Sequence, residues 1–505
     1  MNSSDVTGAE SPAECLSRLL ASGGDERIAL GPPGGVNRYG CPPRPLPQVP
    51  AFGSSTASAI SDAGWAAARI LHRRLEGAGQ GPGADAALAA EADRQRSELA
   101  ALCGVSTLAN TGVVFAASGT DLHLLAAQLC AAETRAHPGP ASLQAVIVEA
   151  AETGCGVPDA LAGRHPGSRP PLAGPVHPGD PVAGAFAVDV TSVPLRFPAG
   201  GAPQNGDHDA RVAELVNAAV NAGRRVLLVV SDQSKTGRLA PRPVCALALL
   251  RRHGGRVRVL VDACQFRLSA ATLRSYLDHG FAVALSGSKF VTGPAFSGAL
   301  LVPPGLSQAW RTRPLPPGLA AYSARADWPV GWAGRDSLPE AANVGLLLRW
   351  EAALAELHAF HRLRPRDIEA FVRAFGGAVQ ARLASGSGFE ALRAPAMDRG
   401  PFAARGSWDL LPTVFPFVLL REGPLDAAGT GSVYRALLTG AGQLGQPVAC
   451  ATSAGRPASA LRLCLGMRTV VDALAPSGRG APALIAEALA LLDAASGLAG
   501  TLPAR

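Results

Sequence analysis

A lysine stands between two apolar segments in the stretch "ALSGSKFVTGPAFSGALLV", residues 284–302, of a chain that contains few lysines. Lys289 follows the first of these segments, and the preceding apolar run, "VRVLVDACQ", ends in Asp262 and Gln265. A lysine amine can hold an aldehyde as a Schiff base, and a carboxylate can keep a ring nitrogen protonated. Together, Lys289 and Asp262 indicate chemistry on an amine or a carbonyl compound.

Further polar residues follow other apolar runs. Ser286 and Ser288 precede Lys289, and "VLLVVSDQSKTG" ends in a segment that contains Ser234 and Lys235. Because ligands of an open α/β sheet bind beyond the carboxyl ends of its strands, we expect these side chains to meet at one edge. Lys235 also follows a strand, so it is the rival of Lys289 for the Schiff base. A lone lysine at a strand end is otherwise a solvated charge.

A candidate anion site lies upstream, where "VVFAASGTDLHLLAAQL" reads as a strand, a tight turn and a helix. The turn consists of Ser118, Gly119 and Thr120, and the amides at a helix N-terminus bind anions such as phosphate. By themselves these residues could be a helix cap, and Asp262 could be one too. A phosphate site, an acid and a lysine are the groups that pyridoxal phosphate (PLP) requires. The pattern therefore predicts a PLP site in which Lys289 forms the Schiff base.

Alternating strand and helix patterns between about residues 98 and 305 would position these groups. The strand candidates are "AVIVEA", "VLLVVS", "VRVLVDA", "AVALSG" and "GALLV". The helical segments between them end in Gly, which is typical of a helix C-terminus. Near-continuous apolar strands separated by helices predict an α/β fold with a mostly parallel sheet covered on both faces.

A second, smaller unit follows from about residue 330. It contains a long helix, "NVGLLLRWEAALAELHAF", the strands "TVFPFVLL" and "ALRLCLGM", and a final helix, "APALIAEALALLDAAS". The first sixty residues are rich in Gly, Pro and Ser and read as an irregular arm. We therefore predict an N-terminal arm over 1–60, a PLP-binding large domain over 61–315 and a C-terminal small domain over 316–505.

The composition argues against several other classes of protein. The 505 residues carry a net charge of +7, but no run of basic residues predicts a nucleic-acid or membrane partner. Apolar stretches are interrupted before the length of a membrane span, and the N-terminus lacks the pattern of a signal peptide. Nine cysteines occur without a C-x-x-C pair or metal-ligand spacing. We expect free thiols in a reducing cytoplasm and no metal site.

The motifs resemble those of the class V aminotransferase and cysteine desulfurase family, PLP enzymes of fold type I. That family has V-D-x-x-Q followed by S-G-H-K-x-x-G-P-x-G-x-G-x-L-x-V, and "VDACQ" and "SGSKFVTGPAFSGALLV" match both patterns in order. The resemblance implies PLP as cofactor and a seven-stranded-type, mostly parallel sheet in the large domain. It also implies a smaller C-terminal α/β domain and a homodimer with sites at the subunit interface.

The resemblance also assigns roles to residues. It places Asp262 at the pyridine nitrogen and Gln265 at the ring hydroxyl. It places Ser286 and Ser288 at the phosphate, beside Gly119 and Thr120. Ser118, Thr153 and Ser234 are the other candidate cofactor-binding residues. The segment "ALRLCLGMRTVVDAL" resembles the family's I-R-x-S strand, which makes Arg462 the clamp for a substrate carboxylate. The arm segment "GVNRYGCP" closes over the site, with Asn37 or Tyr39 at the substrate, or is an exposed turn.

Several positions depart from the family pattern. Ser288 replaces the usual His before the lysine, and Thr153 replaces the His that stacks on the cofactor. Ala341 replaces a Thr that binds phosphate from the partner subunit. Desulfurases need a cysteine nucleophile on a mobile loop before the arginine strand, and one alignment puts Cys450 there. The alignment we favour puts Leu444 there and leaves no thiol, which argues against a desulfurase.

These observations predict a PLP-dependent enzyme that acts on an amino acid or a similar amine. Aminotransfer is the first expectation, and C–S or α,β-elimination, including cysteine desulfurase-like chemistry, is the alternative. A second alternative is a relative that binds a ligand without turnover, since a fold does not establish an activity.

Overall fold

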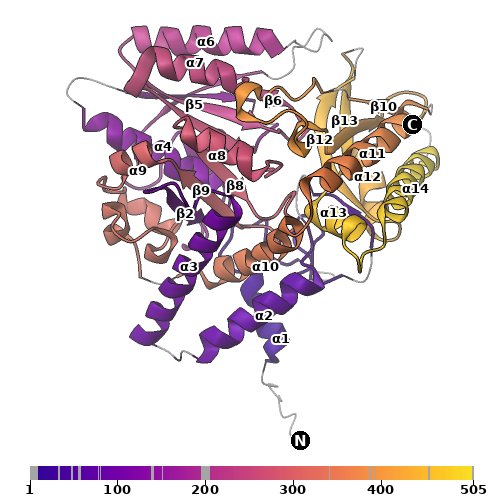
Figure 1. The fold of residues 1–505 in the computed structure, drawn as a ribbon, viewed down its shortest axis with the longest axis horizontal. Helices are drawn as coiled ribbons and strands as arrows, with labels where there is room; N and C mark the ends of the chain where they lie inside the picture. Colours follow the sequence, from indigo (N-terminus) through magenta and orange to yellow (C-terminus); the bar gives the residue numbers. More distant parts are fainter. Residues whose placement is uncertain are drawn as a thin grey trace, which may run out of the picture.

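The computed structural model describes residues 10–502, except for 32–34, 47–48, 55–57, 78, 80, 138–141, 150–151, 195–204, 341, 386–387, 393 and 453–454. Figure 1 shows a large sheet with helices on both faces and a second sheet, formed mainly by the C-terminal part of the chain, at its side. The arrangement matches the predicted α/β architecture.

The large sheet has the strand order β2-β9-β8-β7-β5-β3-β4 in the described part of the chain, and the short β6 pairs with β5. Its strands are β2 (Gly112–Ala116), β3 (Leu143–Val148), β4 (Asp189–Val193), β5 (Arg225–Asp232), β6 (Leu239–Ala240), β7 (Val257–Ala263), β8 (Ala282–Ser286) and β9 (Gly298–Val302). The neighbours from β8 to β4 run parallel, whereas β9 is antiparallel to both β8 and β2. The prediction of a mostly parallel, seven-stranded-type sheet is confirmed.

Helices cover both faces of the large sheet because its strands are apolar on both faces. In β5, Val226, Leu228 and Val230 face one core cluster, whereas Leu227 and Val229 face the other. The first cluster includes residues of α6 (Asn205–Asn221), α7 (Pro243–His253) and α8 (Ala270–Asp278). The second includes residues of α4 (Gly119–Arg135), α5 (Val157–Leu161) and α9 (Pro304–Trp310).

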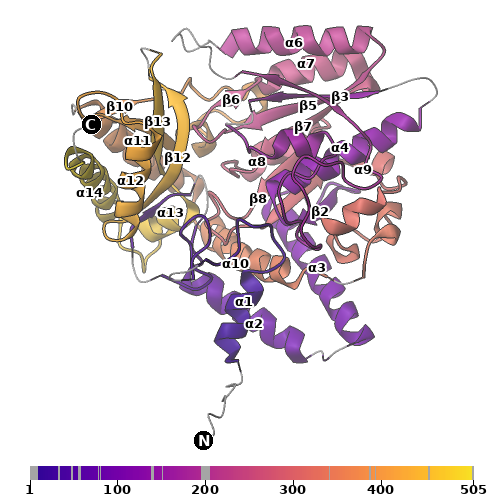
Figure 2. The same ribbon diagram turned by 180° about the vertical axis from the view of Figure 1, so that it is seen from behind.

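The second sheet has the order β1-β12-β13-β11-β10 and lies beside the carboxyl ends of the large sheet's strands (Figure 2). Its strands are β1 (Ala51–Phe52), β10 (Phe389–Ala391), β11 (Val414–Leu419), β12 (Gln443–Ala451) and β13 (Pro457–Cys464). The helices α11 (Pro365–Ala384), α12 (Ala427–Leu438), α13 (Met467–Leu474) and α14 (Ala481–Gly500) accompany it. The sequence predicted β11 and β13, but it did not predict β12 or the pairing of the arm strand β1 with β12.

The N-terminal arm is more ordered than its composition suggested. It begins with α1 (Pro12–Leu20), whose start is fixed by a capping box between Ser11 and Glu14. Arg349 then holds the end of α1, because its fully buried guanidinium donates to the carbonyl oxygens of Leu20 (3.1 Å) and Gly23 (3.0 Å). The domain boundaries at 60/61 and 315/316 stay predictions.

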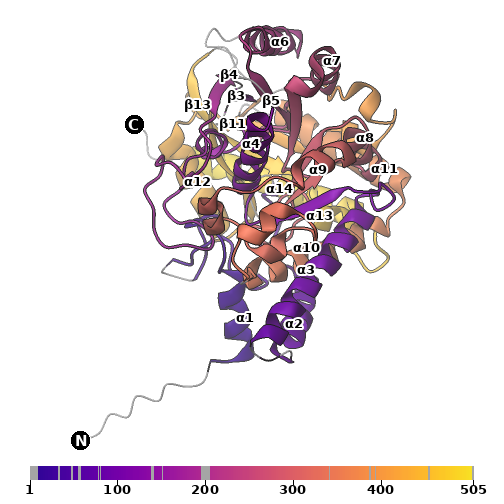
Figure 3. The same ribbon diagram turned by 90° about the vertical axis from the view of Figure 1, so that its left-hand side faces the viewer.

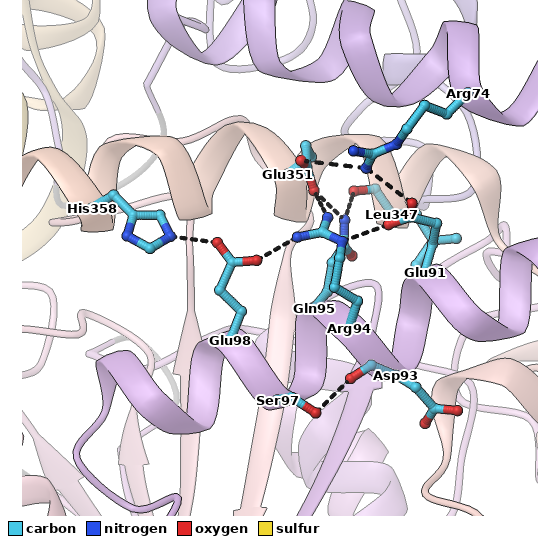
Figure 4. A network of polar contacts seen from close by, with 10 residues as sticks. All are labelled: Arg74, Glu91, Asp93, Arg94, Gln95, Ser97, Glu98, Leu347, Glu351 and His358. Carbon is cyan, nitrogen blue, oxygen red and sulfur yellow. Dashed lines mark hydrogen bonds and ion pairs between the residues drawn. The ribbon is translucent and has the colours of Figure 1, made fainter.

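Three helices form a layer at one end of the molecule, α2 (Asp62–Gly77), α3 (Pro82–Leu102) and α10 (Val344–His361) (Figure 3). Arg94 of α3 joins them, since it donates to Glu91 at 2.6 Å and also to Glu98 and to Glu351 of α10. Arg74 of α2 reaches Glu91 at 2.9 Å (Figure 4). This ion-pair network connects α10, which follows the large sheet in sequence, to α2 and α3, which come before that sheet.

Buried arginines connect the two sheets and the arm. Arg399 forms two contacts with the carboxylate of Asp232 at the end of β5, at 2.6 and 2.9 Å, and neither side chain is exposed by more than 1%. The Tyr276 hydroxyl donates to the same carboxylate at 2.6 Å. Arg267 donates to the carbonyl oxygen of Leu465 at 2.7 Å. Arg267, Arg399 and Arg349, which lies on α10 and contacts the arm, are called the structural arginines below.

One described helix, α14, is long and apolar enough to cross a membrane by length and composition alone. The argument from uninterrupted apolar runs did not identify it. In the structure α14 buries Leu484, Leu491 and Leu492 in the core that it shares with α11 and α12. Core helices of this kind pass the same test, so the helix is weak evidence for a membrane span.

Candidate active site

Asp262 and Lys289 lie at the ends of two neighbouring parallel strands. In the register of the sheet, Asp262 of β7 is paired with Ala284 of β8, and Lys289 follows β8 by three residues. The amide of Phe290 donates to the carbonyl oxygen of Gln265 at 3.2 Å. This bond fixes the lysine turn against the segment that follows Asp262, so the two predicted catalytic residues share one edge of the sheet.

Asp262 has a partner that the sequence analysis missed, His123 of α4. The Oδ2 atom of Asp262 lies 3.5 Å from His123 Nε2, and its Oδ1 atom accepts from the amide of Cys264 at 3.1 Å. His123 Nδ1 lies 2.7 Å from the carbonyl oxygen of Gly119, which can only accept, so the network assigns a proton to Nδ1. The only sequence signal was a His one helical turn beyond the predicted anion site.

The first turn of α4 lies against the end of β7. A Cβ atom on Gly119 would be 2.6 Å from Cys264 Sγ, so only glycine allows this approach. Ser118 is the N-cap, and its Oγ accepts from the amide of Asp121 at 3.2 Å. The capping interpretation of this turn is therefore correct, and it is compatible with an anion at the same helix end. Thr120 completes the turn and is buried.

The arm packs over the same helix end. Tyr39 packs against a cluster that contains Ala117 and Phe296. Ala117 directly precedes the anion turn, and Phe296 follows the lysine turn. Asn37 Oδ1 accepts from the amides of Tyr39 (2.9 Å) and Cys41 (3.1 Å), so Asn37 shapes the arm. The structure thus brings the arm beside the predicted site, and the proposed substrate contacts of Asn37 and Tyr39 stay predictions.

The turn after β5 is organised by a buried carboxylate, that of Glu152, which the sequence analysis did not single out. Glu152 Oε2 accepts from Ser234 Oγ at 2.9 Å and from Thr236 Oγ1 at 2.6 Å. The carbonyl oxygen of Glu152 accepts from the amide of Lys235 at 2.7 Å. The Ser234 hydroxyl, which we assigned to the cofactor, therefore donates to Glu152 in this structure.

Lys235, Lys289 and Arg462 form a group of cations at this edge. Arg462, on β13, is 2% exposed, and its Nη1 atom lies 3.5 Å from the carbonyl oxygen of Lys235. Burial, followed by the positive charges of Arg462 and Lys289, lowers the pKa of Lys235 to about 8. Burial also lowers the pKa of Arg462. Lys235 and Lys289 are the only two lysines of the chain, in which 46 residues are Lys or Arg.

Comparison with known proteins identifies the fold. No protein-family model matches the sequence, and no curated protein sequence matches it. Among solved structures, the cysteine desulfurase CsdA from Escherichia coli has a TM-score of 0.52 at 16% identity, over 89% of this chain and 95% of that one. The cystine C–S lyase C-DES has a TM-score of 0.52 at 16% identity, over 88% and 98% of the two chains.

A third similar structure is the glutamate decarboxylase domain of a diaminobutyrate-pyruvate transaminase and L-2,4-diaminobutyrate decarboxylase from Vibrio parahaemolyticus. Its TM-score is 0.53 at 13% identity, over 90% of this chain and 81% of that one. The chain has the fold of the fold type I PLP enzymes. At these identities the likeness establishes the fold, and the chemistry must be argued from the residues.

The residues of this fold type I site fit PLP. One buried polar atom of the site, Thr153 Oγ1, has no hydrogen-bond partner within the described ranges. Ser286 Oγ and Ser288 Oγ lie 2.7 Å apart and can present hydroxyls to a phosphate. Gln265 fits less directly, since its Oε1 accepts from Arg267 Nε at 3.4 Å. Ala341, the other departure noted above, lies outside the described residues.

One expectation about the desulfurase nucleophile is wrong. We placed Leu444 or Cys450 on a mobile loop before the arginine strand, but both belong to β12. Leu444 is 1% exposed and paired with Phe52 of β1. Cys450 is paired with Ala458, four residues before Arg462, which puts it about 13 Å along the sheet from Arg462 at about 3.3 Å per residue. The sequence "QLGQPVACA" reads as a loop because Gly and Pro interrupt it.

Proposed function

We propose that the protein is a PLP-dependent enzyme that transforms an amino acid or a similar amine, with Lys289 as the residue that holds the cofactor. The observation that carries the proposal is the bond between Phe290 and Gln265, which joins the Lys289 turn to the segment after Asp262 beside the N-terminus of α4. When bound, PLP supplies an electron sink for bonds at the substrate Cα atom.

Each residue of the site has a defined task in this proposal. Asp262 holds a proton at the pyridine nitrogen, and His123 orients Asp262 and supports its negative charge. The first turn of α4 binds the phosphate together with Ser286 and Ser288. Thr153 offers its hydroxyl to the cofactor in place of a stacking ring. Each task is assigned to a residue whose burial or contacts are described above.

Arg462 anchors the substrate carboxylate in this proposal. Its guanidinium is held by the carbonyl oxygens of Lys235 and Gln446, so its position is fixed before a substrate arrives. Gln446 also donates to the carbonyl oxygen of Arg38 at 3.0 Å, which links the arm to the same strand. The arm can therefore help to exclude water from the bound substrate.

Aminotransfer is the first candidate reaction, as the sequence motifs suggest. Elimination at Cβ is the second candidate, and the presence of both lysines of the chain in one site favours it. A cysteine desulfurase is disfavoured, because Cys450 lies in a strand and far from Arg462 along the sheet. A ligand-binding protein without turnover is the remaining alternative, and the presence of both Lys289 and Asp262 at one edge of the sheet argues against it.

We also propose that the protein is a cytoplasmic homodimer. Resemblance to enzymes whose sites lie between two subunits supports the dimer, and the cysteine pattern supports the compartment. Sedimentation of the loaded protein tests the assembly, since an active monomer would contradict it.

Borohydride reduction of the PLP-loaded protein tests the central assignment. We expect the pyridoxyl label on the peptide that contains Lys289, and we expect Lys289→Ala to lose both the label and turnover. Because the chain has a single other lysine, Lys235 is a built-in control. A label on Lys235 would reverse the assignment of the two lysines, and a protein that binds no PLP would refute the proposed function.

A further inference from the structure

The use of lysine in this chain is selective. Of its 46 basic residues, two are lysine and the others are arginine, and both lysines follow strands at the same edge of the large sheet. The chain uses arginine even for the candidate carboxylate clamp, Arg462. A lysine at position 235 therefore points to a task that arginine cannot perform. Arginine keeps its charge at all ordinary pH values, whereas a lysine amine can give up and regain a proton.

We propose that Lys235 is a second proton-transfer group of the active site, which donates a proton to a basic leaving group on the substrate side chain. This inference rests on the proposed function, because it requires the substrate to be held by the cofactor at Lys289. It goes beyond that function by assigning the leaving-group end of the site to a specific residue.

Both backbone polar groups of Lys235 have partners, so the position of this residue is fixed, as a proton donor requires. Its amide donates to the carbonyl oxygen of Glu152 at 2.7 Å, and its own carbonyl oxygen lies 3.5 Å from Arg462 Nη1. The neighbouring Ser234 and Thr236 are tied to the Glu152 carboxylate. The Lys235 turn is therefore fixed beside the predicted carboxylate clamp.

The charges around Lys235 favour release of its proton. Burial, and then the positive charges of Arg462 and Lys289, lower the pKa of Lys235 to about 8, and the smaller effects of Cys155 and Glu152 act in the opposite direction. Below that pH the amine is protonated and can act as an acid. Donation from Lys235 leaves it neutral while Lys289 gains a proton, so the number of positive charges in the site stays the same during the step.

The proton balance of an elimination from serine closes without an oxidant. The Lys289 amine takes the Cα proton, the electron pair of that bond forms a Cα–Cβ double bond, and the Cβ–O bond breaks. Lys235 gives its proton to the departing oxygen, which leaves as water. The released enamine takes up water and yields pyruvate and ammonia, and exchange with solvent restores the protons of the two amines.

Serine and β-chloroalanine form a matched pair of probes. Hydroxide is a poor leaving group without a proton, whereas chloride needs none, so the ratio of the two pyruvate-forming rates isolates the acid. We expect Lys235→Met and Lys235→Arg both to lower the serine-to-chloroalanine ratio by about a hundredfold or more. In the unmodified protein the ratio should fall once the pH rises above the pKa of Lys235, which burial and the charge of Arg462 hold below the ordinary lysine value.

The arginine variant separates proton transfer from simple charge. If Lys235→Arg kept the ratio of the unmodified protein, Lys235 would be an anion-binding group and the inference would be wrong. A protein that releases pyruvate from β-chloroalanine but not from serine would also overturn it. If Lys289 is labelled by borohydride while the ratio does not change in either variant, this inference fails and the proposed function survives.

A measurement without turnover tests the same point. Competitive acetylation of the cofactor-free protein, followed by peptide mass analysis, reports the pH at which the Lys235 amine becomes reactive. We expect a midpoint near 8, and a higher midpoint in Lys289→Met, which removes a neighbouring positive charge. A midpoint near the ordinary lysine value of about 10.4 would contradict the inference.

Discussion

Positive charge is buried in two regions of this molecule and is treated differently in each. The structural arginines are at most 1% exposed, and carboxylate or carbonyl oxygens surround their guanidinium groups. At the active site, Lys235 and Lys289 are half-buried and lie near another cation, Arg462. Oxygen acceptors neutralise the charge of the structural arginines, whereas the cations of the candidate site lie beside one another.

Two aspartates at the ends of neighbouring strands extend the comparison. Asp232 ends β5, and its carboxylate accepts hydrogen bonds from Arg399 and Tyr276. Asp262 on β7 lies beside His123. The Asp232 carboxylate connects the two sheets, and the Asp262 carboxylate is the one that we propose takes part in the chemistry. Adjacent strands place both carboxylates at the same edge of the sheet, yet their partners differ. The position at a strand end therefore predicts where an aspartate lies, and the residues around it determine what it does.

The largest effect should come from Asp262→Asn. An amide cannot keep the pyridine nitrogen protonated, so we expect turnover to fall by about a hundredfold or more while PLP remains bound. Steady-state rates and the absorbance of the bound cofactor measure the two properties separately. Near-normal turnover would remove Asp262 from the proposed chemistry.

Arg399→Met tests the structural side of the comparison. Removing the guanidinium leaves the Asp232 carboxylate buried without its cation, which costs about 3–5 kcal/mol of unfolding free energy. Urea unfolding measures the loss, and the double variant with Asp232→Asn should recover part of it. A loss below about 1 kcal/mol would show that the pair is not needed for stability.

Asp121→Asn should have a smaller effect that depends on pH. Burial, and then the charge of Asp25, raise the pKa of Asp121 to about 7 from an ordinary value near 3.8. A raised carboxyl pKa stabilises the fold only at low pH, and that stability is lost as the pH rises from about 4 to about 7. The variant should therefore gain stability relative to the unmodified protein as the pH rises from 5 to 8, by about 3 kcal/mol, since about two pH units separate pH 5 from the folded-state pKa of about 7.

Thermal unfolding at the two pH values measures this difference. Asp25→Asn provides a control, since removing that neighbouring charge should lower the pKa of Asp121 and shift the sensitive pH range downward. A pH-independent difference between Asp121→Asn and the unmodified protein would rule out the proposed titration.

Cys450→Ser should have the smallest effect. Cys450 lies within β12 and packs against the cluster that contains Val418 and Ala460, so we expect activity to remain close to normal. We also expect cysteine to yield little sulfide above background, measured with a colorimetric sulfide assay. Loss of activity with an unchanged cofactor spectrum would support a desulfurase instead.

The sequence predicted the large sheet well because its strands are continuous apolar runs that end in polar residues. Asp262 and Lys289 could be found for the same reason, since each follows such a run. His123 could not, because a histidine inside a helix carries no signal until the helix is placed over β7. Similarly, Gly445 and Pro447 concealed β12, whose pairing with β13 shifts register between Gly445 and Val448.

The pairing of β1 with β12 affects how the chain is synthesised and folded. Phe52 leaves the ribosome 392 residues before its partner Leu444. At about 5–20 residues per second, the arm waits on the order of 20–80 s before the strand that it joins exists. The second sheet is therefore completed only at the end of synthesis, and a protein lacking the arm would leave the edge of β12 uncovered and open to pairing with other chains.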